Sequence, residues 1–144
     1  MALDDPDIAL KLARGVSRFL EHLGYGTLAE FSLANGRRAD VIGVNERGET
    51  VIVEIKSSPA DFLSDEKWPE YREFCDYFYF AVPMDFPQEL LPDECGLIVA
   101  DAYGAEILRE STAAALNASR RKAVLLRFAL TASLRLRRLV DPDL

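Results

Sequence analysis

Apolar residues in the first part of the chain follow a helical spacing. Six of them fall on one helical face: Ile8, Leu12, Val16, Phe19, Leu20 and Leu23. Asp5 and Pro6 provide an N-cap and a proline in the first turn, and Gly24 follows the last apolar position. The pattern therefore predicts an amphipathic first helix that packs against a sheet.

An extended pattern follows this helix. Residues 27–33 alternate between apolar and polar positions, and residues 41–44 and 51–55 are β-branched runs, so we expect three strands. The last two strands flank a short loop that contains Gly48. If that loop has three residues and Gly48 is left-handed, the hairpin register places Asp40 directly opposite Glu54.

The turn at residues 34–36 is compatible with two registers between the first two strands. A three-residue loop places Glu30 opposite Asp40, so that Glu30, Asp40 and Glu54 form a row across three strands. A two-residue turn at Asn35 and Gly36 shifts the register by one residue and directs Glu30 to the other face. The sequence is compatible with both.

Charged residues occupy one face of this predicted hairpin. Side chains alternate along a strand, so Glu54 and Lys56 share the face that carries Asp40. Opposed carboxylates about 5 Å apart repel by about 3 kcal/mol at an effective dielectric constant of about 20. We therefore expect a cation between the two acids, either the Lys56 ammonium or a divalent metal such as Mg²⁺ or Mn²⁺.

The alternative interpretation is a solvated ion-pair cluster with no function. Ile42 and Ile52 fall on the same face as the charged residues, however, so this face is at least partly covered. Buried charges are uncommon unless they are paired or bind a ligand. The pattern therefore favours a functional site.

The arrangement resembles the motif of the PD-(D/E)xK nucleases, with Asp40, Glu54 and Lys56 in the Asp, Glu and Lys positions. Ala39 stands where the motif has proline, and it is not a ligand position. A longer set of residues is similar to the MmcB-like bacterial DNA repair proteins over nearly the whole chain. It comprises residues 36–40 and 53–58 together with Asp61, Phe62, Lys67, Trp68, Glu70, Tyr71, Cys75 and Asp76.

Further elements are predicted after the hairpin. Ser58 and Pro59 begin a short helix that extends to about residue 66, and Pro69 breaks or kinks it. Residues 76–82 form a strongly β-prone strand, residues 87–92 a loop with one helical turn, and residues 97–100 and 105–109 two short strands. A long helix begins at about residue 113 or 119 and ends at residue 139.

These elements predict one α/β domain over residues 1–144. Its mixed sheet lies between helices and carries a long C-terminal helix, because both sheet faces hold apolar residues. The restriction-endonuclease-like fold implied by the resemblance agrees with this architecture.

Basic residues supply the candidates for nucleic-acid binding. Arg37 and Arg38 precede Asp40, and Lys67 and Tyr71 are spaced to share a helical face. In the last helix Arg120, Arg127 and Arg138 fall nearly on one line, with Arg121 and Arg135 beside them, and such a row can follow a phosphate backbone. The alternatives are that Tyr71 belongs to the hydrophobic core and that the arginines form an ordinary solvated face of the helix.

Composition limits the function further. The net charge of −7 argues against indiscriminate nucleic-acid binding, but residues 117–144 contain seven basic residues and two acids. No apolar run approaches 18 residues, which excludes a membrane span, and the acidic first residues are unlike a secretory signal, so we expect a cytoplasmic location. Cys75 and Cys95 are predicted to be buried, reduced thiols.

The function implied by the resemblance is hydrolysis of DNA by a Mg²⁺- or Mn²⁺-dependent endo- or exonuclease of a repair pathway. Asp40, Glu54 and the Ile55 carbonyl would hold the metal, and Lys56 would orient or deprotonate a water. Glu30, or Glu21 on the first helix, would be the third acid. The expected substrate is single-stranded, branched or damaged DNA. The alternatives are a non-catalytic DNA-binding or adaptor module with the same fold, and an RNA-processing enzyme.

Overall fold

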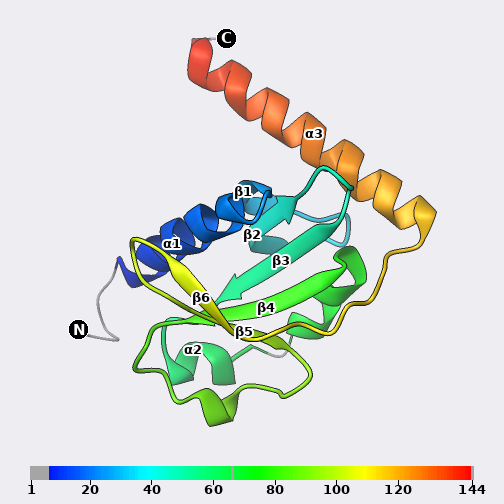
Figure 1. Cartoon of the computed structure of the whole chain (residues 1–144). Coiled ribbons are helices and arrows are strands. Elements are labelled where there is room, and N and C mark those ends of the chain that lie inside the picture. Colours follow the sequence, from blue (N-terminus) through cyan, green and yellow to red (C-terminus); the bar gives the residue numbers. More distant parts are fainter. Residues whose placement is uncertain (1–6, 66, 144) are drawn as a thin grey trace.

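Six strands form one mixed sheet with helices on both faces in the computed structural model, which describes residues 7–65 and 67–143 (Figure 1). In chain order the elements are α1 (Ile8–His22), β1 (Gly26–Ser32), β2 (Arg38–Val44), β3 (Thr50–Ile55), α2 (Pro59–Leu63), the 3₁₀ helix η1 (Trp68–Phe74), β4 (Tyr77–Val82), the 3₁₀ turn η2 (Gln88–Leu90), β5 (Gly96–Ala100), β6 (Ala105–Arg109) and α3 (Ala118–Val140). The strands lie in the order in which they occur in the chain. The predicted fold class is confirmed.

Antiparallel pairs at the two sides of the sheet enclose a parallel centre. β1, β2 and β3 are joined by antiparallel pairs, β3, β4 and β5 are parallel, and β6 is antiparallel to β5. The parallel connection from β3 to β4 needs a crossover, which α2 and η1 supply. The sheet is consistent with a restriction-endonuclease-like fold.

The two hairpin turns set the strand registers. Gly48 has a φ of 77° and Gly36 a φ of 86°, so each glycine supplies the left-handed residue of its turn. Val41 pairs with Val53 and Ala29 with Val41. Both registers are those of the three-residue loops, and the two-residue turn at residues 35–36 is excluded.

Each face of the sheet has its own apolar core. α1 covers one face with Ile8, Leu12, Val16 and Leu20, which pack on side chains from β2, β3, β4 and β5. The other face is covered by η1, by Phe62 of α2 and by the first half of α3. The prediction of a sheet between helices is correct for these reasons, and the expected N-cap at residues 5–6 lies outside the described residues.

α2 is shorter than expected. Its N-cap is the predicted one, since the Ser58 hydroxyl accepts a hydrogen bond from the Asp61 N–H at 3.2 Å. The helix ends at Leu63 instead of near residue 66, because the Asp65 N–H bonds the Phe62 carbonyl and the chain turns toward β3. η1 then begins at Trp68 in a 3₁₀ conformation, with Pro69 in its first turn.

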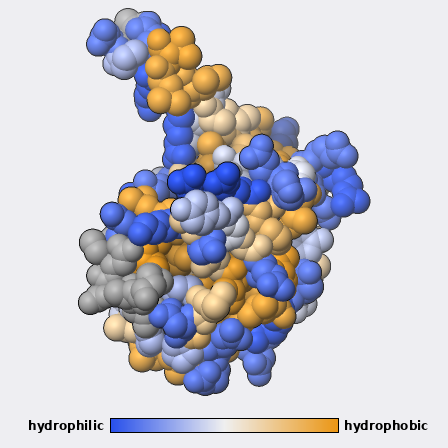
Figure 2. Space-filling view, turned by 60° about the vertical axis from the view of Figure 1, so that its left-hand side comes forward, coloured by the Kyte–Doolittle hydropathy of each residue, from blue (hydrophilic) through white to orange (hydrophobic). Residues whose placement is uncertain are grey.

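α3 packs on the sheet only through its first half. Val124 is buried and Phe128 lies against Phe31 with ring centroids 6.1 Å apart. Arg135 still donates hydrogen bonds to the backbone of β1, and beyond it the C-terminal end of the helix projects into solvent (Figure 1). Figure 2 shows this projecting end with apolar and hydrophilic side chains together. Leu136 and Leu139, which share an apolar arc with Phe128 in the sequence, are therefore exposed.

Candidate active site

Asp40 on β2 and Glu54 on β3 meet as the hairpin register predicts. The Asp40 N–H donates a 2.8 Å hydrogen bond to Oε2 of Glu54, and the Ile55 N–H donates one of 2.8 Å to Oδ2 of Asp40. Each carboxylate thus accepts a hydrogen bond from a backbone N–H of the strand that carries the other acid. The two acids lie on neighbouring central strands, where the backbone cannot easily separate them.

Burial places these carboxylates in an unfavourable electrostatic state. Burial first, and the charge of Asp40 second, raise the pKa of Glu54 to about 8. Burial also raises the pKa of Asp40, although the Ile55 N–H and the nearby Lys56 charge act in the opposite direction. The pair is therefore short of positive charge, and a cation bound between the acids would relieve this.

Lys56 is close to the pair but its ammonium is bound elsewhere. Its Nζ forms an ion pair of 2.8 Å with Oδ2 of Asp65, and the two side chains are 9% and 12% exposed. Asp65 was not predicted as a site residue, because it follows α2 in a segment without regular structure. A buried lysine at the end of a strand requires an acid, and that requirement is the sequence signal that could have led to Asp65.

A cavity of about 530 Å³ gives access to the acids. Its wall includes Asp40, Glu54, Ile55 and Lys56 together with residues from α1, α2 and η1. Of the predicted nucleic-acid ligands, the following line it: Arg37, Arg38, Lys67 and Tyr71. The site is thus a recess that opens to solvent.

The four predicted nucleic-acid ligands around this cavity differ in whether their side chains already bind other groups of the protein. Arg37 pairs with Glu70 at 3.1 Å, whereas Lys67 is exposed. Arg38 is 67% exposed at its side chain. The Tyr71 hydroxyl donates a hydrogen bond of 3.2 Å to the Arg38 carbonyl, and burial raises the pKa of Tyr71. Arg38 and Lys67 are therefore the side chains best placed to contact a phosphate.

Glu30 lies at the rim of the same cavity. Its φ of 49° is left-handed, and Arg135 of α3 donates hydrogen bonds to its carbonyl at 2.7 Å and to that of Ala29 at 2.6 Å. These bonds stabilise a conformation that a non-glycine residue rarely adopts. The Glu30 carboxylate is 70% exposed and lies 3.7 Å from Arg38. Glu21, the other candidate for a third acid, is exposed at the far end of α1 and does not line the cavity.

The arginines of α3 fall into two groups. Arg120 donates to the Glu73 carbonyl at 2.8 Å and lies over the Phe74 ring at 4.5 Å. Arg121 forms a bidentate pair with Asp76. Arg127 and Arg138 are exposed to solvent. The predicted row therefore contains both residues that attach the helix and residues that face outward.

The donor set fits a magnesium-type ion. Within residues 7–65 and 67–143, no group of three or more acidic, histidine or cysteine side chains is arranged to hold a metal. Mg²⁺ commonly binds one or two carboxylates and completes its shell with water and substrate phosphate. The buried Glu54 carboxylate and the half-buried Asp40 carboxylate, beside a solvent-accessible recess, meet that description.

A family model for MmcB-like DNA repair proteins matches residues 2–143. The chain belongs to the MmcB-like family. Among solved structures, it is similar to a protein of unknown function from Silicibacter pomeroyi, with 47% sequence identity and a TM-score of 0.92 over 96% of this chain and 95% of the other. A search among curated proteins gave no significant match. Membership of the MmcB-like family supports a role in DNA repair.

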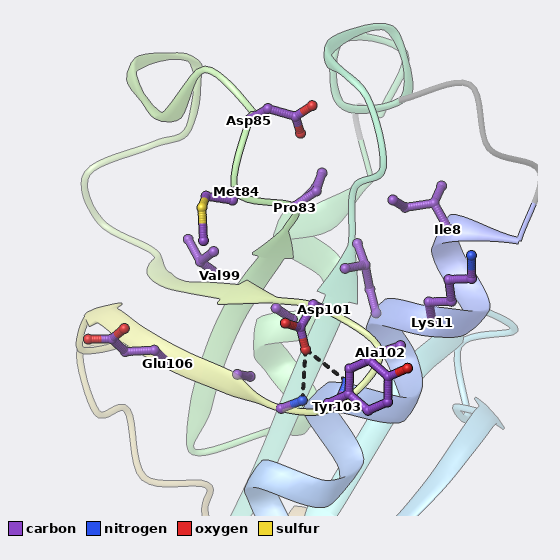
Figure 3. A pocket seen from close by; sticks show the side chains of 14 residues that line it. Ile8, Lys11, Pro83, Met84, Asp85, Val99, Asp101, Ala102, Tyr103 and Glu106 are labelled. Atoms are coloured by element: carbon purple, nitrogen blue, oxygen red, sulfur yellow. Dashed lines mark hydrogen bonds between the residues drawn. The ribbon is translucent and has the colours of Figure 1, made fainter. Parts of the chain in front are cut away.

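A second cavity of this MmcB-like protein is larger, at about 1070 Å³, and lies between α1 and the turn that joins β5 to β6 (Figure 3). Its walls are mostly apolar. Asp101 at its centre accepts hydrogen bonds from the Tyr103 and Gly104 N–H groups at 2.8 and 3.0 Å, so this acid stabilises the turn. The charged residues among the described ones that line it are Lys11, Asp85, Asp101 and Glu106.

Two further sequence predictions concern the whole molecule. Cys75 and Cys95 are buried free thiols, as expected, and burial raises the pKa of each. None of the helices in the described part of the chain has the length and apolar character needed to cross a membrane.

Proposed function

We propose that this MmcB-like protein is a metal-dependent deoxyribonuclease that acts in DNA repair, with its active site at Asp40, Glu54 and Lys56. The observation that supports this most strongly is the convergence of the buried Glu54 carboxylate, the half-buried Asp40 carboxylate and a lysine in one open recess. Perturbed acids in a cleft are typical of functional sites. Structural acids, by contrast, are normally neutralised by partners within the protein.

The residues have distinct roles in this proposal. Asp40, Glu54 and the Ile55 carbonyl would hold Mg²⁺ or Mn²⁺, which when bound activates a water and neutralises charge on the scissile phosphodiester. Lys56 would orient that water and stabilise the developing negative charge on the phosphate. Glu30 would complete the site from the rim, since its carboxylate is exposed next to the cavity.

DNA would approach over the basic side chains at the rim of the cavity. Arg38 and Lys67 are exposed beside the acids and would bind phosphates on either side of the cleaved bond. α3 carries seven basic residues and no acid between residues 118 and 140. Its outward-facing Arg127 and Arg138 would extend the contact along the DNA, whereas Arg120 would contribute mainly by fixing the helix.

Cleavage assays test the proposal directly. Single-stranded, branched and damaged DNA are incubated with the purified protein and Mg²⁺ or Mn²⁺, beside Lys56→Ala prepared in the same way. We expect hydrolysis that requires the metal and is lost in the variant. No difference between wild type and Lys56→Ala on any of these substrates would reject the nuclease.

The second candidate is a DNA-binding module that keeps the fold without catalysis. It is favoured by one observation: the ammonium of Lys56 is paired with Asp65, away from the two acids that would hold a metal. In that case the protein binds DNA but gives no metal-linked heat in calorimetry with Mn²⁺. The same experiment with Asp40→Ala separates the candidates, because only the nuclease loses heat in this variant.

A further inference from the structure

Asp65 is held firmly in the position from which it binds Lys56. Its Oδ1 accepts a 2.7 Å hydrogen bond from the Lys67 N–H, while Oδ2 faces the Lys56 ammonium at 2.8 Å. Its own N–H bonds the Phe62 carbonyl at 2.9 Å, and the Phe62 ring packs edge-on against Phe80 of β4 at 5.4 Å. The carboxylate is therefore anchored to the sheet through α2.

The Lys56 ammonium is also close to the Asp40 and Glu54 carboxylates. Lys56 follows Glu54 by two residues, so both side chains leave the same face of the strand about 7 Å apart along it. The Lys56 charge is close enough to act on both Asp40 and Glu54. Without Asp65, these two carboxylates would be available as anionic partners for the buried lysine.

We propose that Asp65 is a positioning residue: it holds the Lys56 ammonium away from the Asp40–Glu54 pair and so keeps these carboxylates open to a divalent cation. This inference rests on the proposed metal site. An ammonium placed between the acids would neutralise part of their charge and would have to be displaced before a metal could bind. Asp65 removes that competitor and leaves Lys56 beside the site.

The test compares Mn²⁺ binding by calorimetry in wild type, Asp65→Asn and the double variant Asp65→Asn/Lys56→Met. We expect the dissociation constant for Mn²⁺ to rise about tenfold or more in Asp65→Asn and to return to near the wild-type value in the double variant, because the competing ammonium is then gone. Asp93→Asn is the matched control, since it removes the same charge from an exposed position. An Asp65→Asn protein that binds Mn²⁺ like wild type overturns the inference.

A second measurement separates this inference from the proposed function. In a crystal structure of metal-free Asp65→Asn, Nζ of Lys56 is expected between the carboxylates of Asp40 and Glu54. If it remains beside residue 65 or turns to solvent, the inference is wrong whatever the metal does. Wild-type protein that takes up no Mn²⁺, with Nζ moving as expected, rejects the metal site alone.

Folding of the variants is checked by circular dichroism before either measurement. If Asp65→Asn does not fold, Asp65→Glu replaces it and displaces the carboxylate by one methylene group. A weaker Mn²⁺ affinity in Asp65→Glu supports the inference, and an unchanged affinity contradicts it.

Discussion

Two buried acids near opposite ends of β3, Glu54 on the strand itself and Asp76 just before β4, have opposite electrostatic environments. Asp76 accepts hydrogen bonds from the Thr50 N–H at 2.7 Å and the Leu116 N–H at 2.9 Å, and a bidentate pair from Arg121 at 2.7 and 2.8 Å. Burial alone would raise the pKa of Asp76, but these partners lower it to about 2. Its charge is fully compensated within the protein.

Glu54 receives much less compensation. The Asp40 N–H is its backbone donor, Asp40 itself adds a like charge, and the adjacent Lys56 is paired with Asp65. Burial and the Asp40 charge leave its pKa raised to about 8. The comparison indicates that Asp76 stabilises the attachment of α3 to the sheet, whereas Glu54 is kept at a cost in stability that a bound cation would offset.

The largest expected effect is the loss of the proposed DNA cleavage when the charge of Glu54 is removed. Glu54→Gln should lower the cleavage rate by about a thousandfold, which is the usual effect of removing one key electrostatic group from an active site. The amide oxygen can still accept the Asp40 N–H, so the fold should persist. Single-turnover cleavage with Mn²⁺ measures the rate, and a variant within tenfold of wild type would show that Glu54 is not a catalytic ligand.

The same kind of acid-to-amide substitution at Asp76 should lower the stability of the fold instead. Asp76→Asn leaves the Arg121 guanidinium without its partner, and breaking a buried ion pair in this way costs about 3 to 5 kcal/mol of unfolding free energy. Urea denaturation provides the value. Asp93→Asn should change it by less than about 0.5 kcal/mol. A loss for Asp76→Asn as small as that of the control would mean that Asp76 does not hold α3.

Glu54 and Asp76 should make contributions to stability that change in opposite directions with pH. A carboxyl whose pKa is raised on folding binds more protons in the folded state, so its contribution is present below the unfolded value of 4.5 and is lost as the pH rises through about 8. The metal-free protein should therefore lose on the order of 2 kcal/mol between about pH 5 and pH 8.5.

Two controls sharpen this prediction. The loss should disappear in Glu54→Gln, and urea denaturation at the two pH values measures it. Asp76 behaves in the opposite way, because its lowered pKa gives stability that is present above pH 3.8 and is lost as the pH falls toward 2. A stability that rises between pH 5 and 8.5 in wild type but not in Glu54→Gln would contradict the raised pKa of Glu54.

The smallest effect concerns the arginines of α3. Arg127→Gln removes one exposed charge and should weaken DNA binding a few-fold, with the slope of log affinity against log salt reduced by about 1. Stability should not change. Arg121→Gln, its control, should lower stability through the loss of the Asp76 pair. Fluorescence anisotropy at several salt concentrations provides the slope, and an unchanged slope for Arg127→Gln would place the DNA elsewhere.

The sequence was sufficient to predict the sheet and the central pair of acids. Gly36 and Gly48 define the two hairpin turns, and the alternation of the strands then specifies which residues face each other. Asp40 and Glu54 meet for that reason alone. Regular structure carries this information because register and side-chain direction follow from local rules.

The parts that were missed depend on contacts between distant segments. Asp65 reaches Lys56 from a turn that no periodic pattern describes, and α2 ends early to place it there. The left-handed conformation of Glu30 requires Arg135, more than 100 residues later in the chain. Likewise, the apolar arc of α3 gave no indication that Leu136 and Leu139 extend beyond the sheet and remain exposed.

Titration of Mn²⁺ into the metal-free protein, followed by calorimetry, tests the metal site at Asp40 and Glu54 most directly. Wild type and Asp76→Asn, under conditions where both are folded, should each bind Mn²⁺ with the same affinity, and Asp40→Asn should give no binding heat. Absence of heat in wild type, or equal heat in Asp40→Asn, would show that the two uncompensated acids do not form a metal site.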